Sequence, residues 1–218
     1  MASIRAAYRD FFTRERVRSL LVALFILALS LIFQFYAGIY SAQRSGRFVG
    51  DLFLDNLPVV NLNPIIVEGA LFAIFGSILL VIAKPRYSIF ALKAVAVFLA
   101  LRAFFVSATH LGIYPGQVVP GDGILDQLYL AFGLETGYFF SAHTGLPILM
   151  ACIFWRERFW RVTYLTLSAV FGISVLLAHV HYSIDVFAAP FMTYSIFKLS
   201  EYLFKNDYLL TNPAPDIL

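Results

Sequence analysis

Apolar residues form six long runs along the chain, and connections of different lengths, which carry most of the turn-forming residues, separate them. Each run approaches the ~20 helical residues that are needed to cross a bilayer. Turn-forming residues stand between the runs, such as Asn63-Pro64 before the second run and a glycine-rich stretch before the fourth. The pattern predicts an all-α integral membrane protein, a six-transmembrane-helix bundle with helices at residues 20–40, 64–83, 87–109, 138–155, 162–179 and 183–204.

Composition supports the membrane interpretation. Of the 218 residues, 61% are hydrophobic and only 13% are charged, and the mean hydropathy is +0.81. The sequence pI near 9.0 does not indicate a nucleic-acid partner, because the basic residues flank apolar runs. The chain has one cysteine, which excludes an internal disulfide framework and a thiolate metal cluster. This residue, Cys152, lies inside an apolar run and is expected to serve in packing.

The connections differ in charge, and this difference predicts the orientation of the bundle. The third connection carries Asp122, Asp126 and Glu135 and has neither Lys nor Arg. Because positive residues remain in the cytoplasm, we expect both termini on the cytoplasmic side. The basic residues before the first run, in the second and fourth connections and in the tail are Arg5, Arg9, Arg14, Arg16, Arg18, Lys84, Arg86, Arg156, Arg158, Arg161 and Lys205.

The first run is expected to be a retained membrane helix. It is longer than the ~7–15 apolar residues of a signal peptide, and no A-x-A site follows it at the right place. We therefore divide the chain into a basic cytoplasmic segment at residues 1–18, a six-helix membrane catalytic domain at 19–204 and a cytoplasmic tail at 205–218.

Four ionisable residues fall near the extracytoplasmic ends of the runs. His181 and Asp185 are four residues apart, so a helix would place them on one face. His143 stands at the start of the fourth run, and Arg102 lies seven residues before Thr109, about 10 Å below the outer end of the third run. Ionisable groups at membrane depth are costly, so their common level indicates a functional site.

This set of residues suits attack on a phosphoester. A neutral imidazole attacks phosphorus directly, Asp185 stabilises the cation that forms on His181, and the second imidazole, His143, protonates the leaving group. The Arg102 guanidinium and the amide groups at a helix start capped by Ser141 are suited to hold phosphate oxygens. Neither a metal nor another cofactor is required. The sequence therefore predicts an enzyme whose active site is on the extracytoplasmic face.

Other interpretations stay open at this point. His143 alone can cap a helix, and Arg102 can extend to lipid phosphates. An intramembrane metal hydrolase would use His143, His179, His181 and Asp185 as ligands, although the spacing of His179 and His181 then needs an irregular backbone. A non-enzymatic transporter or scaffold is a further alternative, and the clustering of the polar residues at one end of the runs disfavours it.

Two motifs resemble those of a known family. Ser141-Ala142-His143-Thr144 is similar to the Ser-Gly-His-Thr motif of sphingomyelin synthases, and the sequence His-Tyr-Ser-Ile-Asp-Val at 181–186 is similar to their second histidine motif. Those enzymes belong to the type 2 phosphatidic acid phosphatase (PAP2) superfamily of six-span lipid phosphatases and phosphotransferases. The resemblance covers roughly residues 90–200. It implies that His181 is the nucleophile, that Asp185 is its carboxylate partner and that His143 is the general acid and base. The candidate substrate-binding residues are Arg102, Ser141 and Thr144.

Some positions depart from the family patterns. Ala142 replaces the usual glycine, and Ser174-Val175 stands where general phosphatases have Ser-Arg. Lys93 and Arg102 do not fit the Lys-x6-Arg-Pro motif, and these departures favour the synthase branch. We therefore predict a lipid phosphotransferase that moves a phospho-head group from a phospholipid to a lipid alcohol, ceramide or diacylglycerol, through a phosphohistidine. The alternative is a PAP2-type lipid phosphate phosphatase with water as the acceptor.

The third connection, residues 111–137, is predicted to cover the site. Its apolar residues can lie on the site, and its glycines allow bends. Such a cover would keep water from the phosphohistidine, as transfer to a lipid alcohol requires. An ordinary connector is the alternative. Lys93, in the inner half of the third run, is expected to extend toward the cytoplasmic surface.

Overall fold

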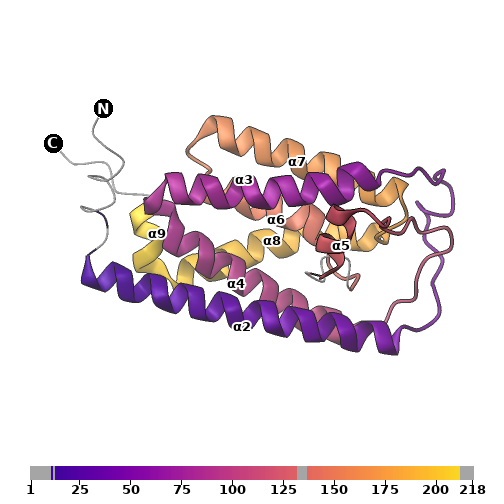
Figure 1. Ribbon diagram of the computed structural model, residues 1–218, viewed down its shortest axis with the longest axis horizontal. Helices are drawn as coiled ribbons and strands as arrows, with labels where there is room; N and C mark the ends of the chain where they lie inside the picture. Colours follow the sequence, from indigo (N-terminus) through magenta and orange to yellow (C-terminus); the bar gives the residue numbers. More distant parts are fainter. Residues whose placement is uncertain (1–10, 12, 132–136, 212–218) are drawn as a thin grey trace.

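The computed structural model describes residue 11 and residues 13–131 and 137–211. These residues form helices and connections, and no strand occurs among them (Figure 1). The helices are α2 (Arg14–Arg44), η1 (Pro64–Glu68, a π-helix), α3 (Gly69–Ala83), α4 (Pro85–Ala108), α5 (Ile124–Ala131), α6 (Ala142–Ile153), α7 (Arg158–Leu177), α8 (Ser183–Leu203) and α9 (Lys205–Thr211). A long helix therefore lies in five of the six predicted runs, and the shorter α6 lies in the fourth.

Local sequence signals set several of the helix starts. Pro64 and Pro85 occupy the first turns of η1 and α4, where a missing N–H group is tolerated. The side chains of Thr13 and Ser141 accept backbone N–H groups at the starts of α2 and α6. These signals are local, which is why the sequence located most of the helices correctly.

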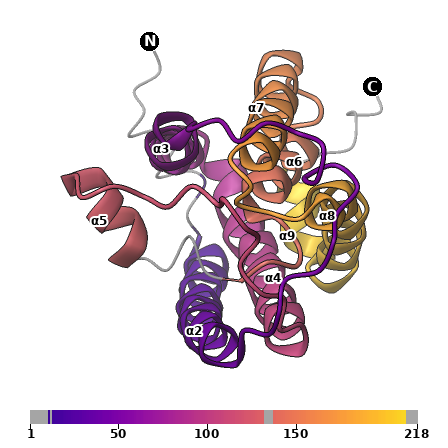
Figure 2. The same ribbon diagram turned by 90° about the vertical axis from the view of Figure 1, so that its right-hand side faces the viewer.

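The centre of the bundle is formed by α4 and α6. Helix α4 packs against α2, α3, α6, α8 and α9, while α6 packs against α7 and α8. Figure 2 looks along the bundle and shows α4 and α6 between the other long helices. At Gly145, an added Cβ would lie 2.8 Å from Thr193 Oγ1 and 2.9 Å from the Phe98 ring, so α6 approaches its neighbours closely there. This close packing fixes the first turns of α6 within the bundle.

The ends of the bundle differ in what they carry. In Figure 1, α2 begins at the left end and α9 lies there too, whereas α5 lies in the right half and the connections around it reach the right end. The described parts nearest to the two chain ends therefore lie at the same end of the bundle, and the placement of both termini in the cytoplasm stays a prediction. Arg5 and Arg9, and residues 212–218 of the predicted tail, lie outside the described residues.

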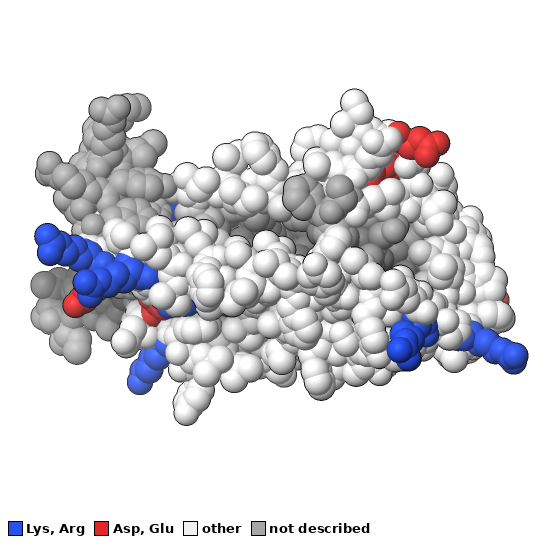
Figure 3. Space-filling model, turned by 60° about the horizontal axis from the view of Figure 1, so that its bottom comes forward, with Lys and Arg blue, Asp and Glu red and all other residues white. Residues whose placement is uncertain are grey.

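The surface along the helices is apolar. Phe25, Phe72 and Phe191 are 65%, 70% and 77% exposed on α2, α3 and α8. In the view of Figure 3, Lys and Arg gather toward the ends of the molecule and the middle shows no charged residue. Large apolar side chains around the middle of a bundle are stable when lipid surrounds them. The apolar helices therefore indicate a multi-pass membrane protein.

Only some of the helices satisfy the length and hydropathy expected of a membrane span. In the described part of the chain there are four: α2, α3 together with η1, α4 and α7. Helix α8 has 21 residues but is not among them, and α6 has only 12. Twelve helical residues extend about 18 Å, which is shorter than the ~30 Å hydrocarbon core. The six-span arrangement therefore stays a prediction.

The fourth run begins its helix later than the sequence suggested. The predicted helix at 138–155 is observed as α6, which starts at Ala142. The preceding residues instead form a non-helical segment, in which the carbonyl groups of Gly137 and Phe140 accept hydrogen bonds from Arg102. A distant side chain thus stabilises the segment that shortens this helix.

Lys93 reaches the end of the bundle that carries the start of α2 and α9, where it forms an ion pair that the sequence did not predict. Its side chain is buried, and its ammonium group lies 2.6 Å from Asp207 Oδ2 and 2.8 Å from Ser19 Oγ. Asp207 belongs to α9, so the first residues of the predicted tail fold back against α4. The partner is far away in the sequence, and the local pattern around Lys93 therefore did not indicate it.

Candidate active site

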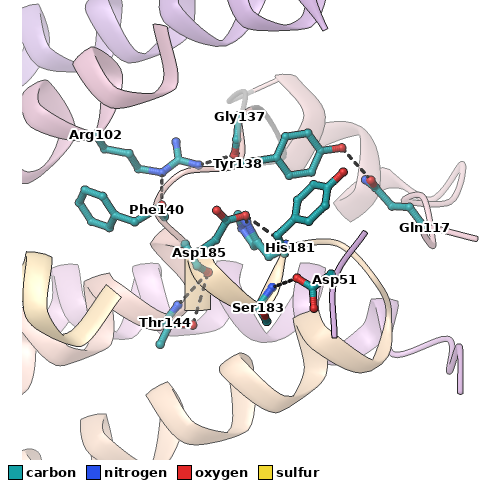
Figure 4. Close-up of polar contacts among 12 residues, drawn as sticks. Asp51, Arg102, Gln117, Gly137, Tyr138, Phe140, Thr144, His181, Ser183 and Asp185 are labelled. Carbon is teal, nitrogen blue, oxygen red and sulfur yellow. Dashed lines mark hydrogen bonds and ion pairs between the residues drawn. The ribbon is translucent and has the colours of Figure 1, made fainter. Parts of the chain in front are cut away.

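His181 and Asp185 form the contact that their spacing predicted, but by a different local geometry. His181 precedes α8, and Tyr182 is the N-cap of that helix. His181 Nδ1 lies 3.2 Å from Asp185 Oδ2, and the same oxygen accepts the backbone N–H of Tyr182 at 3.1 Å (Figure 4). This contact uses Nδ1 of His181, so Nε2 is the ring nitrogen that remains for chemistry.

The start of α6 lies directly beside this pair. The backbone N–H of Ser141 donates to the backbone carbonyl of Asp185 at 3.1 Å, which joins the two sequence motifs. Ser141 Oγ accepts the N–H of Thr144 at 3.4 Å, as a helix cap does. Ser168 Oγ donates to the carbonyl of Thr144 at 2.9 Å and connects α7 to the same turn. Ser141 and Thr144 therefore order this turn in the described structure.

The two histidine rings lie edge to face beside each other. Their centroids are 5.9 Å apart with an interplanar angle of 68°. His143, His181 and Asp185 are 8%, 4% and 0% exposed, so all three polar side chains lie inside the protein. Long-range packing thus brings together the three residues that the sequence singled out as catalytic candidates. Their roles remain predictions.

Arg102 lies at the same level but makes contacts that the sequence did not predict. Its Nε donates to the carbonyl oxygen of Phe140 at 3.0 Å, and its Nη2 donates to that of Gly137 at 2.8 Å (Figure 4). Gly137 has φ +81°, and an added Cβ would collide with Val106, so glycine is required there. Arg102 therefore stabilises the segment before α6, and its role as a phosphate ligand remains a prediction.

Tyr129 is a site residue that the sequence analysis missed. Its hydroxyl oxygen lies 2.8 Å from His143 Nε2, and its side chain is only 1% exposed. It belongs to α5, inside the connection that was expected to cover the site, and it packs with Val67 and Ala70. No motif marks it among the twelve tyrosines of the chain. Only the packing of α5 shows the contact.

Asp51 is a second residue that sequence reasoning did not place at the site. Its Oδ2 accepts the backbone N–H of Ser183 at 2.7 Å, at the first residue of α8 (Figure 4). Its Oδ1 accepts the N–H groups of Phe53 and Leu54 at 2.9 Å and 3.2 Å. Burial acts to raise the pKa of Asp51, but these hydrogen bonds outweigh it and hold the pKa below 3.8. An ionised Asp51 therefore connects the first connection to the helix that follows His181.

The third connection contacts the site, as the cover prediction requires. Tyr182 donates from its hydroxyl to the carbonyl of Gly112 at 2.8 Å, and Tyr138 donates to Gln117 Oε1 at 2.9 Å. The Tyr138 ring lies edge-on to His181, with centroids 6.4 Å apart. Residues 112–117 thus contact the two tyrosines beside His181, whereas α5, from another part of the same connection, contacts His143. Glu135 of the same connection lies outside the described residues.

The metal-hydrolase alternative gains no support from the side-chain arrangement. Within the described ranges, no group of three or more His, Cys, Asp or Glu side chains is arranged to hold a metal ion. His179 adopts a left-handed backbone conformation with φ 55°, and its ring packs edge-on against Tyr114 at 5.2 Å between centroids.

Comparison with known proteins gives one match. Residues 136–202 match the family model described as PAP2 superfamily C-terminal. The matched stretch contains His143, His181 and Asp185, and it indicates phosphatase or phosphotransferase chemistry. No curated protein and no solved structure matches the chain. The match does not distinguish the synthase branch from other members of the superfamily.

Proposed function

We propose that the protein is a membrane lipid phosphotransferase that moves a phospho-head group from a phospholipid to a lipid alcohol such as ceramide or diacylglycerol. The observation that carries the proposal is the pairing of His181 with Asp185, at 3.2 Å, beside the His143 ring. A carboxylate on Nδ1 orients the imidazole and supports positive charge on it, which is what a nucleophile toward phosphorus needs. No cofactor takes part.

The proposed reaction has two steps. In the first, His181 Nε2 forms a bond to phosphorus as the bond from phosphorus to the diacylglycerol oxygen breaks. That oxygen keeps the electron pair and takes a proton from His143. In the second, the hydroxyl of the acceptor gives its proton to His143 and bonds to phosphorus, while the phosphorus–nitrogen bond breaks and returns its electron pair to His181.

Shielding from water favours a lipid alcohol as the acceptor. A phosphohistidine reacts with water unless the site excludes it. His143, His181 and Asp185 are each at most 8% exposed. Tyr129 of α5 contacts His143, and residues 112–117 contact Tyr138 and Tyr182, the tyrosines beside His181. The site lies at the end of the bundle with α5, which the charge pattern assigns to the extracytoplasmic side. The proposed donor is therefore a lipid of the outer leaflet.

Hydrolysis is the second candidate, because the site lies beside polar connections. Gln117 contacts Tyr138, whose ring lies beside His181, and Asp51 contacts Ser183, two residues after His181. A water molecule that enters between these connections would convert the same phosphohistidine into a free phospho-head group. The chemistry at His181 is identical in both reactions, and only the acceptor differs.

A product analysis tests the proposal. Purified protein is reconstituted into vesicles with isotope-labelled phosphatidylcholine, phosphatidylethanolamine or phosphatidic acid, with and without ceramide or diacylglycerol. Mass spectrometry then identifies where the label goes. Transfer to the lipid alcohol, absent in His181→Ala, supports a phosphotransferase. Release of the free phospho-head group or phosphate in both conditions supports the phosphatase. No turnover of any donor contradicts both.

A further inference from the structure

We propose that Tyr129 is a positioning residue for His143, and that it makes Nδ1 of His143 the nitrogen that exchanges a proton with the substrate. The inference rests on the proposed function, because it assigns the proton-transfer atom of that reaction. Tyr129 comes from α5, so this assignment also makes α5 a necessary part of the active site.

The contact geometry carries the proposal. The Tyr129 hydroxyl is 2.8 Å from His143 Nε2, and both side chains are buried. The other ring nitrogen, His143 Nδ1, is buried and has no hydrogen-bond partner among the described residues. A buried polar atom without a partner costs free energy unless a ligand satisfies it. We therefore assign Nδ1 to the substrate.

The two histidines are then held in opposite senses. His181 uses Nδ1 for Asp185 and presents Nε2, whereas His143 uses Nε2 for Tyr129 and presents Nδ1. In each case the partner orients the ring, and the Asp185 carboxylate, which only accepts, also fixes the tautomer of His181. The Tyr129 hydroxyl can donate or accept, and the proposal assigns it the acceptor role. The rings are 5.9 Å apart between centroids, so both presented nitrogens belong to one site.

The proton path follows from this assignment. His143 begins the first step as a cation, with Nε2–H donating to the Tyr129 oxygen and Nδ1–H directed to the leaving oxygen. When Nδ1 gives up its proton, the neutral ring keeps the proton on Nε2 and the hydrogen bond to Tyr129. In the second step Nδ1 takes the proton of the acceptor hydroxyl. Tyr129 thus retains one hydrogen bond through the cycle and gains or loses no proton.

The chemical difference between the partners suits the two roles. His181 carries positive charge when it holds the phosphoryl group, and the Asp185 carboxylate stabilises that charge. His143 must release its proton during the same step. A carboxylate partner would hold that proton more strongly, whereas a neutral hydroxyl orients the ring without doing so. A tyrosine is therefore the suitable partner for the proton-transferring histidine.

The packing of α5 sets the position of Tyr129. Its ring packs with Val67 of η1 and Ala70 of α3, and α5 contacts η1. The turn before α5 is ordered by Asp126, whose oxygens accept the N–H groups of Gly121 and Gly123 at 3.0 Å and 3.2 Å. The tyrosine is thus presented by a folded helix with its own contacts.

The test compares Tyr129→Phe with Tyr164→Phe. Tyr164 is a matched control, because it is also a buried tyrosine whose hydroxyl contacts a side chain, Ser77 Oγ at 2.8 Å, and it takes no part in the site. Each variant is assayed by rapid quench for the first chemical step with two donors that share a phospho-head group. The pairs are phosphatidylcholine with p-nitrophenyl phosphocholine, and phosphatidic acid with p-nitrophenyl phosphate.

The expected result depends on the leaving group. Expulsion of the diacylglycerol oxygen needs a proton, so Tyr129→Phe slows this step about 10- to 100-fold, with little change in KM. p-Nitrophenolate leaves without a proton, so the same variant slows that step less than about threefold. Tyr164→Phe leaves both rates near those of the wild type. Equal rates for Tyr129→Phe and Tyr164→Phe with both donors overturn the proposal, and so does equal slowing of Tyr129→Phe with both.

A second measurement covers the case in which Tyr129→Phe does not fold. Nitrogen NMR of the wild-type protein with labelled histidine reports the tautomer of each of the four histidines, and a His143→Gln sample identifies the His143 signals. The proposal requires that the neutral form of the His143 ring carries its proton on Nε2. A neutral ring with its proton on Nδ1 overturns it. If the wild-type protein turns over neither donor pair, the proposed function fails instead, and the NMR result still decides the Tyr129 contact.

Discussion

The two histidines of the site are supported by different kinds of contact. Asp185 holds His181 from four residues further along the chain, across the start of one helix. Tyr129 holds His143 from a separate helix, which packs on η1 rather than on α6. The first support is local and survives as long as α8 begins at Ser183. The support of His143 by Tyr129 exists only when α5 packs against η1, so it depends on the fold of the entire third connection.

This difference separates two functions within one site. In the proposed reaction the local pair supplies the nucleophile, and its geometry does not depend on the position of α5. In the proposed reaction the remote pair controls proton transfer. A change in the sequence or position of α5 should therefore alter proton transfer without changing the nucleophile. The comparison therefore predicts that damage to the His181 half stops all reactions, whereas damage to the His143 half depends on the substrate.

The largest expected effect is that of His181→Ala. Without the imidazole no phosphohistidine forms, and turnover falls by at least about 10⁴-fold with every donor. Asp185→Asn keeps the nucleophile but removes the negative charge beside it, so a residual rate about 100- to 10,000-fold below that of the wild type should remain. Turnover of a radiolabelled donor measures the rate of each variant. The acid-labile label on the protein measures the phosphohistidine. Labelled phosphohistidine in His181→Ala would contradict the assignment of the nucleophile.

His143→Ala should strongly slow the first chemical step with phospholipid donors and not with p-nitrophenyl donors. General acid catalysis contributes about 100- to 10,000-fold, so loss with a phospholipid donor should fall in that range. With a p-nitrophenyl donor the first step needs no acid and should remain within about tenfold of the wild type. Rapid-quench rates of the first step provide the measurement. An equal loss with both donors would mean that His143 does more than transfer a proton.

Asp51→Asn should have a moderate effect that falls on the His181 half. The charge-assisted hydrogen bond to Ser183 N–H is weakened, at a cost of about 1–2 kcal/mol in the free energy of unfolding. The loss of rate should be similar for phospholipid and p-nitrophenyl donors, because no proton transfer is involved. Asp122→Asn, in an exposed part of the third connection, serves as the control. A loss confined to phospholipid donors would contradict this division of the site.

The same residue predicts a pH dependence of stability. The pKa of Asp51 in the folded protein lies below 3.8, so the ionised carboxylate stabilises the fold above that value. As the pH falls through the folded-state pKa, Asp51 is protonated and its contribution is lost. The difference in melting temperature between the wild type and Asp51→Asn should be constant above about pH 5 and should shrink below pH 3.8. A difference that grows with acidity would show the opposite sign.

Chelation should have the smallest effect. The proposed reaction uses two imidazoles and a carboxylate, so treatment with EDTA or 1,10-phenanthroline should leave transfer and hydrolysis unchanged. Vanadate, which imitates five-coordinate phosphorus, should inhibit in the same assay. Activity that is lost on chelation and restored by zinc would favour the metal-hydrolase alternative. It would contradict the proposed roles of His181 as nucleophile and His143 as acid.

Much of the fold was predictable because its signals are local. The helices at 64–83, 87–109, 162–179 and 183–204 were located to within four residues. The error in the fourth run arose from Arg102, which bonds the carbonyls of Gly137 and Phe140 and keeps the preceding segment out of the helix. Such a contact joins residues 35 and 38 positions apart, and hydrophobic periodicity carries no information about it.

By itself, the sequence determined the membrane character, the contact of His181 with Asp185 and the presence of His143 at the start of a helix. Each depends on hydrophobicity or on residues at most four positions apart, whose contacts stay within a short stretch of the chain. The tertiary structure alone decided that Tyr129 contacts His143 and that Asp51 contacts the first residue of α8. Those contacts join segments through packed connections. Their distances are set by the sum of many side-chain contacts, which no short stretch of sequence encodes.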